Sequence, residues 1–190
     1  MKNVSHFELT LATKSHVVSG WRGATIMTAV TYLCAQISFH IPPTPIPMTM
    51  QVFAVLLSGL VLGSRWGFIS QLQYLALGML GAPVFALGRA GFPVLFGLTG
   101  GYLLSYPFAA LLVGFLVEKI SDKATPNRRT NLQMLACLVG LGIIYTYGCT
   151  WFWAVGRTTP FLSIVMGAMW FVLFDLVKAV LAIGVAKTVR

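Results

Sequence analysis

A long uncharged stretch near the start of the chain limits the fold more than any other feature. Between Arg22 and Arg65 there is no Lys, Arg, Asp or Glu. This stretch is longer than one helical membrane crossing, which takes about 20 apolar residues. Over all 190 residues only 9% are charged, whereas a typical soluble domain has about 25%. The sequence therefore excludes an ordinary water-soluble fold and predicts a membrane-embedded protein.

The apolar segments are long and continuous, which favours helices over the strands of a membrane barrel. Barrel strands are segments of about ten residues with alternating polarity. We predict an all-α integral membrane protein with six transmembrane helices, forming a single membrane domain over residues 1–190. The expected spans are residues 24–39, 49–63, 66–81, 97–117, 132–155 and 161–187.

The charges of the connecting segments orient these spans. The segments expected on the inner side hold ten basic residues, and the outer loops hold only Arg89 and Arg157. Cytoplasmic loops carry an excess of Lys and Arg, so both termini are expected in the cytoplasm. Residues 1–20 form a polar cytoplasmic segment without a signal-peptide core, and residues 118–131 form the main cytoplasmic loop. Because the basic residues are dispersed, the net charge of +9 indicates topology and not nucleic-acid binding.

Asp175 and Lys178 are charged residues inside the sixth expected span. Counted from Phe161 at about 1.5 Å per residue, Asp175 lies roughly 20 Å into an apolar layer about 30 Å thick. The i, i+3 spacing places both side chains on one helix face. A pair at this depth faces the bundle interior or a polar cavity. It either binds a ligand or neutralises itself and fixes helix packing.

Three other polar residues are candidates for the same interior. Arg89 is the lone charge of the outer loop 82–96, where its guanidinium either binds a carboxylate or is solvated. Gln51 begins the second expected span, and Tyr74 lies on a polar face of the third. Amides and phenols in such places either bind a polar ligand or form hydrogen bonds between helices.

Small residues recur four apart in the first expected span, at Ala24 and Thr28. Small side chains at this spacing allow helices to approach closely. The two residues either pack the first helix within the bundle or form a docking face for a partner membrane protein.

Sequence motifs for catalysis or metal binding are absent. The chain has no GxxxxGK[ST] phosphate loop, no GxSxG and no HExxH. Its three cysteines are scattered, so neither a metal site nor a cofactor is expected. An integral-membrane enzyme that acts through Asp175 and Lys178 is the alternative from another class. It would convert its ligand, whereas a transport protein would release the ligand unchanged.

Five separated motifs resemble those of the BioY family, the biotin-binding S components of energy-coupling-factor transporters. They are, in order, residues 45–51 (PIPMTMQ), 63–67 (GSRWG), 74–86 (YLALGMLGAPVFA), 97–107 (GLTGGYLLSYP) and 175–178 (DLVK). The resemblance covers about residues 24–187. It implies six helices, cytoplasmic termini and one biotin held near the outer side of the bundle.

The resemblance also implies a binding site and partners. The family's binding positions fall on Gln51, Tyr74, Arg89, Asp175 and Lys178. Asp175 would accept hydrogen bonds from ureido N–H groups, Lys178 would donate to the ureido carbonyl, and Arg89 would bind the valerate carboxylate. Family members work with a transmembrane T component and two ABC-type ATPases. The absence of a phosphate loop agrees with an energy supply on other chains.

Two versions of this role remain open. The resemblance implies vitamin uptake by a multi-pass protein of the bacterial inner (cell) membrane. The AxxxA pattern associated with docking to the T component is degenerate here, since Thr28 stands four residues after Ala24. The chain is then either a component coupled to ATPases or a self-sufficient biotin facilitator.

Overall fold

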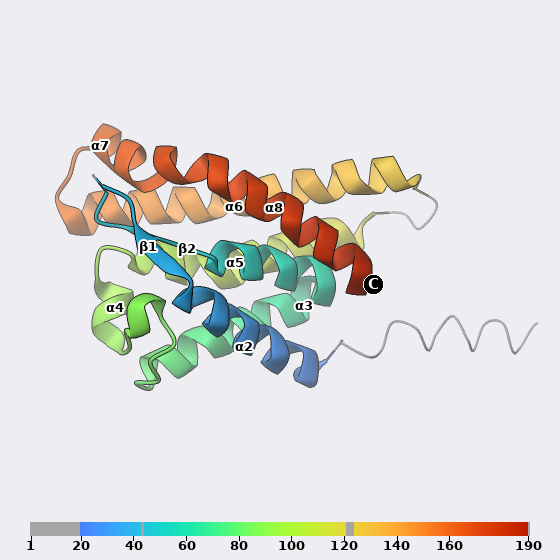
Figure 1. Ribbon diagram of the computed structural model, residues 1–190, viewed down its shortest axis with the longest axis horizontal. Coiled ribbons are helices and arrows are strands. Elements are labelled where there is room, and N and C mark those ends of the chain that lie inside the picture. Colours follow the sequence, from blue (N-terminus) through green and yellow to red (C-terminus); the bar gives the residue numbers. More distant parts are fainter. Residues whose placement is uncertain (1–19, 43, 121–123, 190) are drawn as a thin grey trace, which may run out of the picture.

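The helices run along the long axis of an elongated bundle (Figure 1). The structure is a computed structural model that describes residues 20–42, 44–120 and 124–189. Its elements are, in chain order, α2 (Trp21–Gln36), β1 (Ser38–His40), β2 (Pro47–Thr49), α3 (Gln51–Met79), η2 (Ala86–Gly88), α4 (Phe92–Phe96), α5 (Gly100–Glu118), α6 (Pro126–Gly156), α7 (Pro160–Ile164), the π-helical turn η3 (Val165–Met169) and α8 (Trp170–Val189).

The α3 element is a helical hairpin and not a straight rod. Its backbone reverses at Gly63, where φ is 78°. Glycine adopts this region freely, whereas other residues are strained there. The reversal brings Gln51 against Tyr74, and Gln51 Nε2 donates to Tyr74 Oη over 2.6 Å. In a straight helix these residues would be about 35 Å apart. The two arms of α3 are therefore the second and third expected spans.

The described residues form six long helical segments, namely α2, the two arms of α3, α5, α6 and the α7–α8 segment. This agrees with the six expected spans. By length and composition, four of the described helices can cross a membrane: α3, α5, α6 and the continuous run Pro160–Val189. In the described residues, the departure from an all-α fold is the short antiparallel pair of β1 and β2.

The two ends of the bundle carry different elements (Figure 1). Helix α2 begins, α6 begins and α8 ends at one end, and the short helices α4 and α7 lie at the other. The start of α2 and the end of α8 therefore lie at the same end of the bundle, as an even number of membrane crossings requires. Of the predicted N-terminal segment, residues 1–19 lie outside the described residues.

Helices extend into both ends of the predicted cytoplasmic loop 118–131. Helix α5 continues through Glu118, and α6 already begins at Pro126. Thr125 caps α6, since its side chain accepts a hydrogen bond from the main-chain N–H of Arg128. A threonine cap followed by proline at the first helical position is a strong start signal. The polar composition of residues 118–131 favoured a loop, although the capping signal for a helix lies within it.

The Pro-rich segment between the first two expected spans is bounded by a β-hairpin, which the prediction of an all-α fold did not include. Ser38 pairs with Thr49 and His40 pairs with Pro47. Its connecting turn is tied to the rest of the bundle, because Thr44 Oγ1 donates to the carbonyl of Met166 in η3 over 2.7 Å. The hairpin is thereby fixed beside the start of α8.

Candidate functional site

Asp175 and Lys178 form an ion pair inside the bundle. Lys178 Nζ lies 2.6 Å from Asp175 Oδ1, and the two side chains are 7% and 3% exposed, in that order. Both residues lie on α8, one turn apart, so the i, i+3 spacing alone brings them together. The prediction that the pair faces the interior is confirmed. Because each charge offsets the other, neither is left as an isolated buried ion.

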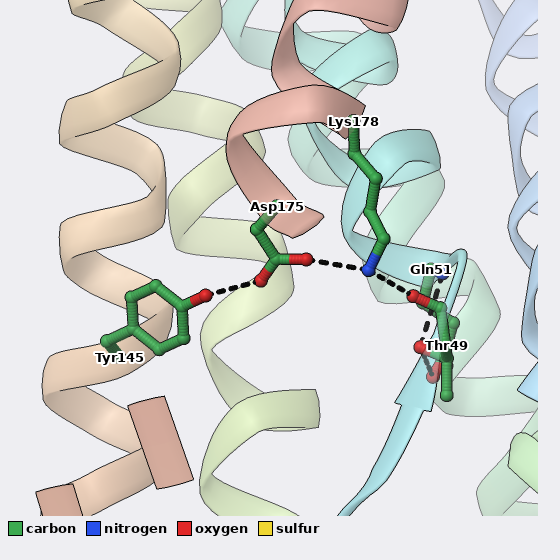
Figure 2. A network of polar contacts seen from close by, with 5 residues as sticks. All are labelled: Thr49, Gln51, Tyr145, Asp175 and Lys178. Atoms are coloured by element: carbon green, nitrogen blue, oxygen red, sulfur yellow. Dashed lines mark hydrogen bonds and ion pairs between the residues drawn. The ribbon is translucent and has the colours of Figure 1, made fainter. Parts of the chain in front are cut away.

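Two further groups contact this pair, as Figure 2 shows. Lys178 Nζ also donates to the main-chain oxygen of Thr49 over 2.7 Å. On the other side, Tyr145 Oη donates to Asp175 Oδ2 over 2.5 Å. Thr49 Oγ1 in turn donates to Gln51 Oε1 over 2.9 Å. The result is a continuous polar network that runs from α6 through α8 to β2 and the start of α3.

Gln51 and Tyr74 lie on facing arms of α3, and only Gln51 reaches the network around the ion pair. Tyr74 is fully buried, and its hydroxyl donates to the carbonyl of Val84 over 2.9 Å. Its ring packs edge to face against Phe85, with 5.6 Å between ring centroids. Tyr74 therefore lies behind Gln51 and holds the Gln51 amide in place.

Arg89 lies in the loop that follows η2. The main-chain N–H of Phe85 donates to the Arg89 carbonyl over 3.0 Å, which closes the turn. The Arg89 side chain is exposed, and it forms no hydrogen bond or ion pair with another described residue. A guanidinium in this state keeps all five N–H donors available for a carboxylate.

A cavity brings most of these groups together. Its polar wall contains Thr49, Gln51, Arg89, Tyr145, Asp175 and Lys178. Its apolar wall includes Ile46, Val52, Phe85, Val94, Leu103, Ile144 and Phe171. A mainly apolar wall with a few polar groups is typical of a site for a small molecule. Of the five predicted site residues, Gln51, Arg89, Asp175 and Lys178 line this cavity, and Tyr74 does not.

The length of α3 explains why this cavity lies inside the bundle. The first arm of α3, residues 51–62, rises about 18 Å, whereas an apolar membrane layer is about 30 Å thick. The arm is therefore too short to cross such a layer by itself. The β-hairpin lies beyond it, and Pro47, Met48 and Thr49 of that hairpin contribute to the cavity wall.

Ala24 and Thr28 pack within the chain. Ala24 is fully buried and Thr28 is 5% exposed. Thr28 Oγ1 lies 2.8 Å from the carbonyl oxygen of Ser70 and 2.9 Å from Gln73 Oε1, both on the second arm of α3. The two small residues thus allow α2 to approach α3 closely. Docking of a partner protein through them stays a prediction.

Two members of the polar network, Tyr145 and the Thr49 carbonyl, were not predicted from the sequence. Tyr145 belongs to an apolar run and is 30 positions from its partner Asp175. A main-chain oxygen has no signal in a sequence at all. Tyr145 is nevertheless one of the few hydroxyl groups on α6, so a search for polar atoms in the fifth expected span would have included it.

Comparisons with known proteins show which family this chain resembles. A family model described as "BioY family" matches residues 11–190. The "Probable biotin transporter BioY" of Pyrococcus horikoshii is 36% identical over 165 residues, which cover 87% of this chain and 92% of the relative. The "Biotin transporter BioY" of Thermotoga maritima is 39% identical over 168 residues, which cover 88% of this chain and 93% of the relative.

A solved structure shares the fold. It is the crystal structure of the S-component for biotin from an ECF-type ABC transporter, and it matches with a TM-score of 0.82 at 24% identity. The match covers 100% of this chain and 94% of the other. Together with the family model, which spans nearly the whole sequence, these likenesses show that this chain is a multi-pass membrane protein that belongs to the BioY family.

Proposed function

We propose that this chain is the biotin-binding S component of an energy-coupling-factor transporter in a bacterial inner membrane. It takes up biotin from the outer side and depends on a T component and ABC-type ATPases for energy. The observation that carries the proposal is the buried Asp175–Lys178 pair in the wall of a mostly apolar cavity that also contains the unpaired Arg89. Family membership supports the same role and sets aside the membrane-enzyme alternative.

The chemistry of biotin matches the groups that line the cavity. The ureido ring carries an N–H donor and a carbonyl acceptor side by side on one edge. Asp175 and Lys178 offer an acceptor and a donor side by side, because their oxygen and nitrogen are 2.6 Å apart. A lysine ammonium has three N–H donors, and two of them are used by Asp175 and Thr49. The third is left for the ureido carbonyl.

The rest of biotin fits the remaining wall. The thiophane ring and alkyl tail are apolar, and Phe85, Leu103 and Phe171 supply apolar surface. The tail ends in a carboxylate, for which Arg89 supplies a free guanidinium. A charge-assisted bond of this kind is about twice as strong as a neutral one. Arg89 therefore holds the tail, and the Asp175–Lys178 pair holds the ureido ring.

The distribution of basic residues supports cytoplasmic termini and an outward-facing cavity. Arg22 lies in the first turn of α2, Lys119 follows α5, Arg128 lies in the first turn of α6 and Lys187 lies in the last turn of α8. The starts of α2 and α6 and the end of α8 share one end of the bundle. Inner ends of membrane helices carry such an excess. The opposite end, with the loop that carries Arg89, then faces outward.

Ligand-dependent thermal unfolding tests the substrate. The purified chain in detergent is heated with biotin, desthiobiotin or riboflavin. Biotin at 100 times its dissociation constant should stabilise the fold by about 2.7 kcal/mol. A shift with riboflavin and none with biotin would overturn the assignment.

Two substitutions test the site. Asp175→Asn and Arg89→Ala should each weaken biotin binding by about 1.5–3 kcal/mol, the worth of a hydrogen bond to a charged group. Arg157→Ala is the matched control, because Arg157 is also exposed but does not line the cavity. Affinities within about threefold of wild type for both site variants would contradict the assigned residues, because such a change is well below a lost charged hydrogen bond.

Uptake measurements test the need for partners. Biotin uptake is measured in a host that lacks any coupling module, with and without ATP depletion. We expect no uptake until the T component and ATPases are supplied. Uptake by the chain alone that persists after ATP depletion would identify a self-sufficient facilitator.

A further inference from the structure

We propose that Tyr145 is a positioning residue of the ligand site, which holds the Asp175 carboxylate in the orientation that accepts a ureido N–H. The inference rests on the proposed function, since it concerns the same cavity and the same ligand. It adds a side chain on α6 to a site whose predicted residues all lie on α3, α8 and the loop after η2.

The Asp175 carboxylate is held from two sides (Figure 2). Oδ1 accepts from Lys178 Nζ on the same helix over 2.6 Å, and Oδ2 accepts from Tyr145 Oη on α6 over 2.5 Å. The terminal torsion of an aspartate is broad and soft, so a single donor leaves the carboxylate plane free to turn. Two donors on different helices fix that plane.

A carboxylate fixed in this way still has acceptor capacity. It has about four lone-pair positions on its two oxygens, and the two bonds described use one on each oxygen. Asp175 is also a cavity-lining residue. A free lone pair can therefore point into the cavity beside the ammonium group of Lys178, where the N–H and carbonyl edge of a ureido ring would bind.

The choice of a phenol as the second donor has an electrostatic reason. Asp175 and Lys178 already offset each other's charge at the site. A second cation would leave a buried net charge, which is costly. The hydroxyl of Tyr145 fixes the carboxylate and adds no charge. Tyr145 also lines the cavity, so its bond to Asp175 belongs to the ligand site and not to a separate interhelical contact.

The position of α8 increases the importance of this bond. Only 28% of the apolar stretch in the last helical run, Pro160–Val189, is buried, compared with 67% of the apolar stretch in α5. Helix α8 therefore has less packing to fix its rotation, and the Tyr145–Asp175 bond anchors it to α6 at the level of the ion pair. Loss of the bond would affect the ureido end of the site and leave Arg89, on its separate loop, in place.

Tyr145→Phe tests the proposal, because it removes only the hydroxyl. We expect the dissociation constant for biotin, measured by titration calorimetry on the full chain in detergent, to rise about tenfold, as for other lost hydrogen bonds to charged groups. The matched control is Tyr147→Phe. Tyr147 is two residues away on α6, is 51% exposed and stacks on Phe108 outside the cavity. Its substitution should leave the biotin affinity unchanged within about twofold.

A spectroscopic measurement separates positioning from general loosening. The infrared difference spectrum between biotin-bound and free protein contains the carboxylate band of Asp175, which is identified by its loss in Asp175→Asn. Tyr145→Phe should shift this band, because the band responds to the hydrogen bond on Oδ2. Tyr147→Phe should leave it in place. A structural role alone would lower the unfolding temperature without moving the band.

The outcomes distinguish this inference from the proposed function. If the unmodified chain does not bind biotin, the proposed function fails and the role of Tyr145 fails with it. If the unmodified chain binds biotin and Tyr145→Phe binds equally well, or leaves the Asp175 band unmoved, only the role of Tyr145 is overturned.

Discussion

The contact between α3 and α5 and the contact between α6 and α8 hold their helices together in opposite ways. Between α3 and α5 the main chains touch. A Cβ on Gly59 would lie 2.6 Å from the carbonyl oxygen of Ala110, and one on Gly114 would overlap the main chain of Gly63 and Ser64. Between α6 and α8, a hydrogen bond joins Tyr145 to Asp175, and a cavity opens beside it.

The buried fractions of these helices differ in the same way. In the apolar stretches of α3 and α5, 61% and 67% of the residues are buried. In the apolar stretches of α6 and of the last helical run, Pro160–Val189, the shares are 39% and 28%. Gly142 and Gly184 lie on the exposed surface of that side, and nothing lies within 4 Å of a Cβ built on either of them. One half of the bundle is thus packed main chain against main chain. The other half is less buried and carries the charged pair that lines the cavity.

The largest effect is expected from Lys178→Met. It keeps the length of the side chain but leaves Asp175 as an unpaired buried charge, which costs about 3–5 kcal/mol. The unfolding temperature of the ligand-free chain in detergent should fall steeply, and biotin binding should be lost. A variant as stable as the wild type would show that the ion pair does not hold the α6–α8 side together.

A second substitution sharpens this test. Adding Asp175→Asn to Lys178→Met removes the stranded charge, so most of the lost stability should return. Biotin binding should stay lost, because both recognition groups are gone. Recovery of binding together with stability would place the ligand elsewhere.

Gly114→Ala tests the half that is packed main chain against main chain. The added methyl group would overlap the main chain of Gly63 and Ser64, which cannot turn aside as a flexible side chain can. We expect a loss of about 3 kcal/mol, at the upper end of the range for overpacking. Thermal unfolding of the purified variant measures this loss. A tolerated alanine would contradict the close contact between α3 and α5.

Thr44→Val tests the tie between the β-hairpin and the less buried half. The substitution keeps the shape of the side chain but removes the hydroxyl that donates to the Met166 carbonyl and accepts from the main-chain N–H of Ile46. A loss of about 2 kcal/mol is expected, typical of two neutral hydrogen bonds. Hydrogen exchange should then increase in residues 38–49 and not in α5. Unchanged exchange in the hairpin would show that other contacts hold it.

Gly184→Ala should have the smallest effect and is the matched control for Gly114→Ala. It is the same change, made in α8 where the new methyl group meets no atom within 4 Å. Alanine favours a helix more than glycine does, so stability should stay equal or rise by up to about 1 kcal/mol. Equal losses for the two alanine variants would remove the contrast between the two halves.

Much of the fold could be predicted from the sequence because membrane insertion depends on local composition. The uncharged run after Arg22 predicted a membrane-embedded chain, and the Gly63 turn lies at the boundary between the second and third expected spans. The β-hairpin was not foreseen, because strand pairing depends on contacts between residues ten or so apart. The start of α6 at Pro126 was not predicted, because the polar composition of the segment favoured a loop although Thr125 can cap a helix.

The site was predictable where its members are close in sequence. Asp175 and Lys178 share a helix face at any i, i+3 spacing, so their pairing followed from the chain alone. Tyr74 and Gln51 are 23 positions apart and meet only because Gly63 reverses the backbone. Because Tyr74 contacts Gln51, it lies behind the cavity wall. Its position on a polar helix face did not predict this.

The sequence by itself determined a helical membrane protein with a charged pair in its last span. Hydropathy and helical spacing are local properties that hold whatever the neighbouring helices do. Only the tertiary structure decided which groups surround that pair, namely Tyr145 from α6 and the main-chain oxygen of Thr49 from β2. Those contacts depend on how the helices rotate and approach one another. Rotation and approach are in turn fixed by packing between distant segments, above all by the glycine contacts that bring α3 against α5.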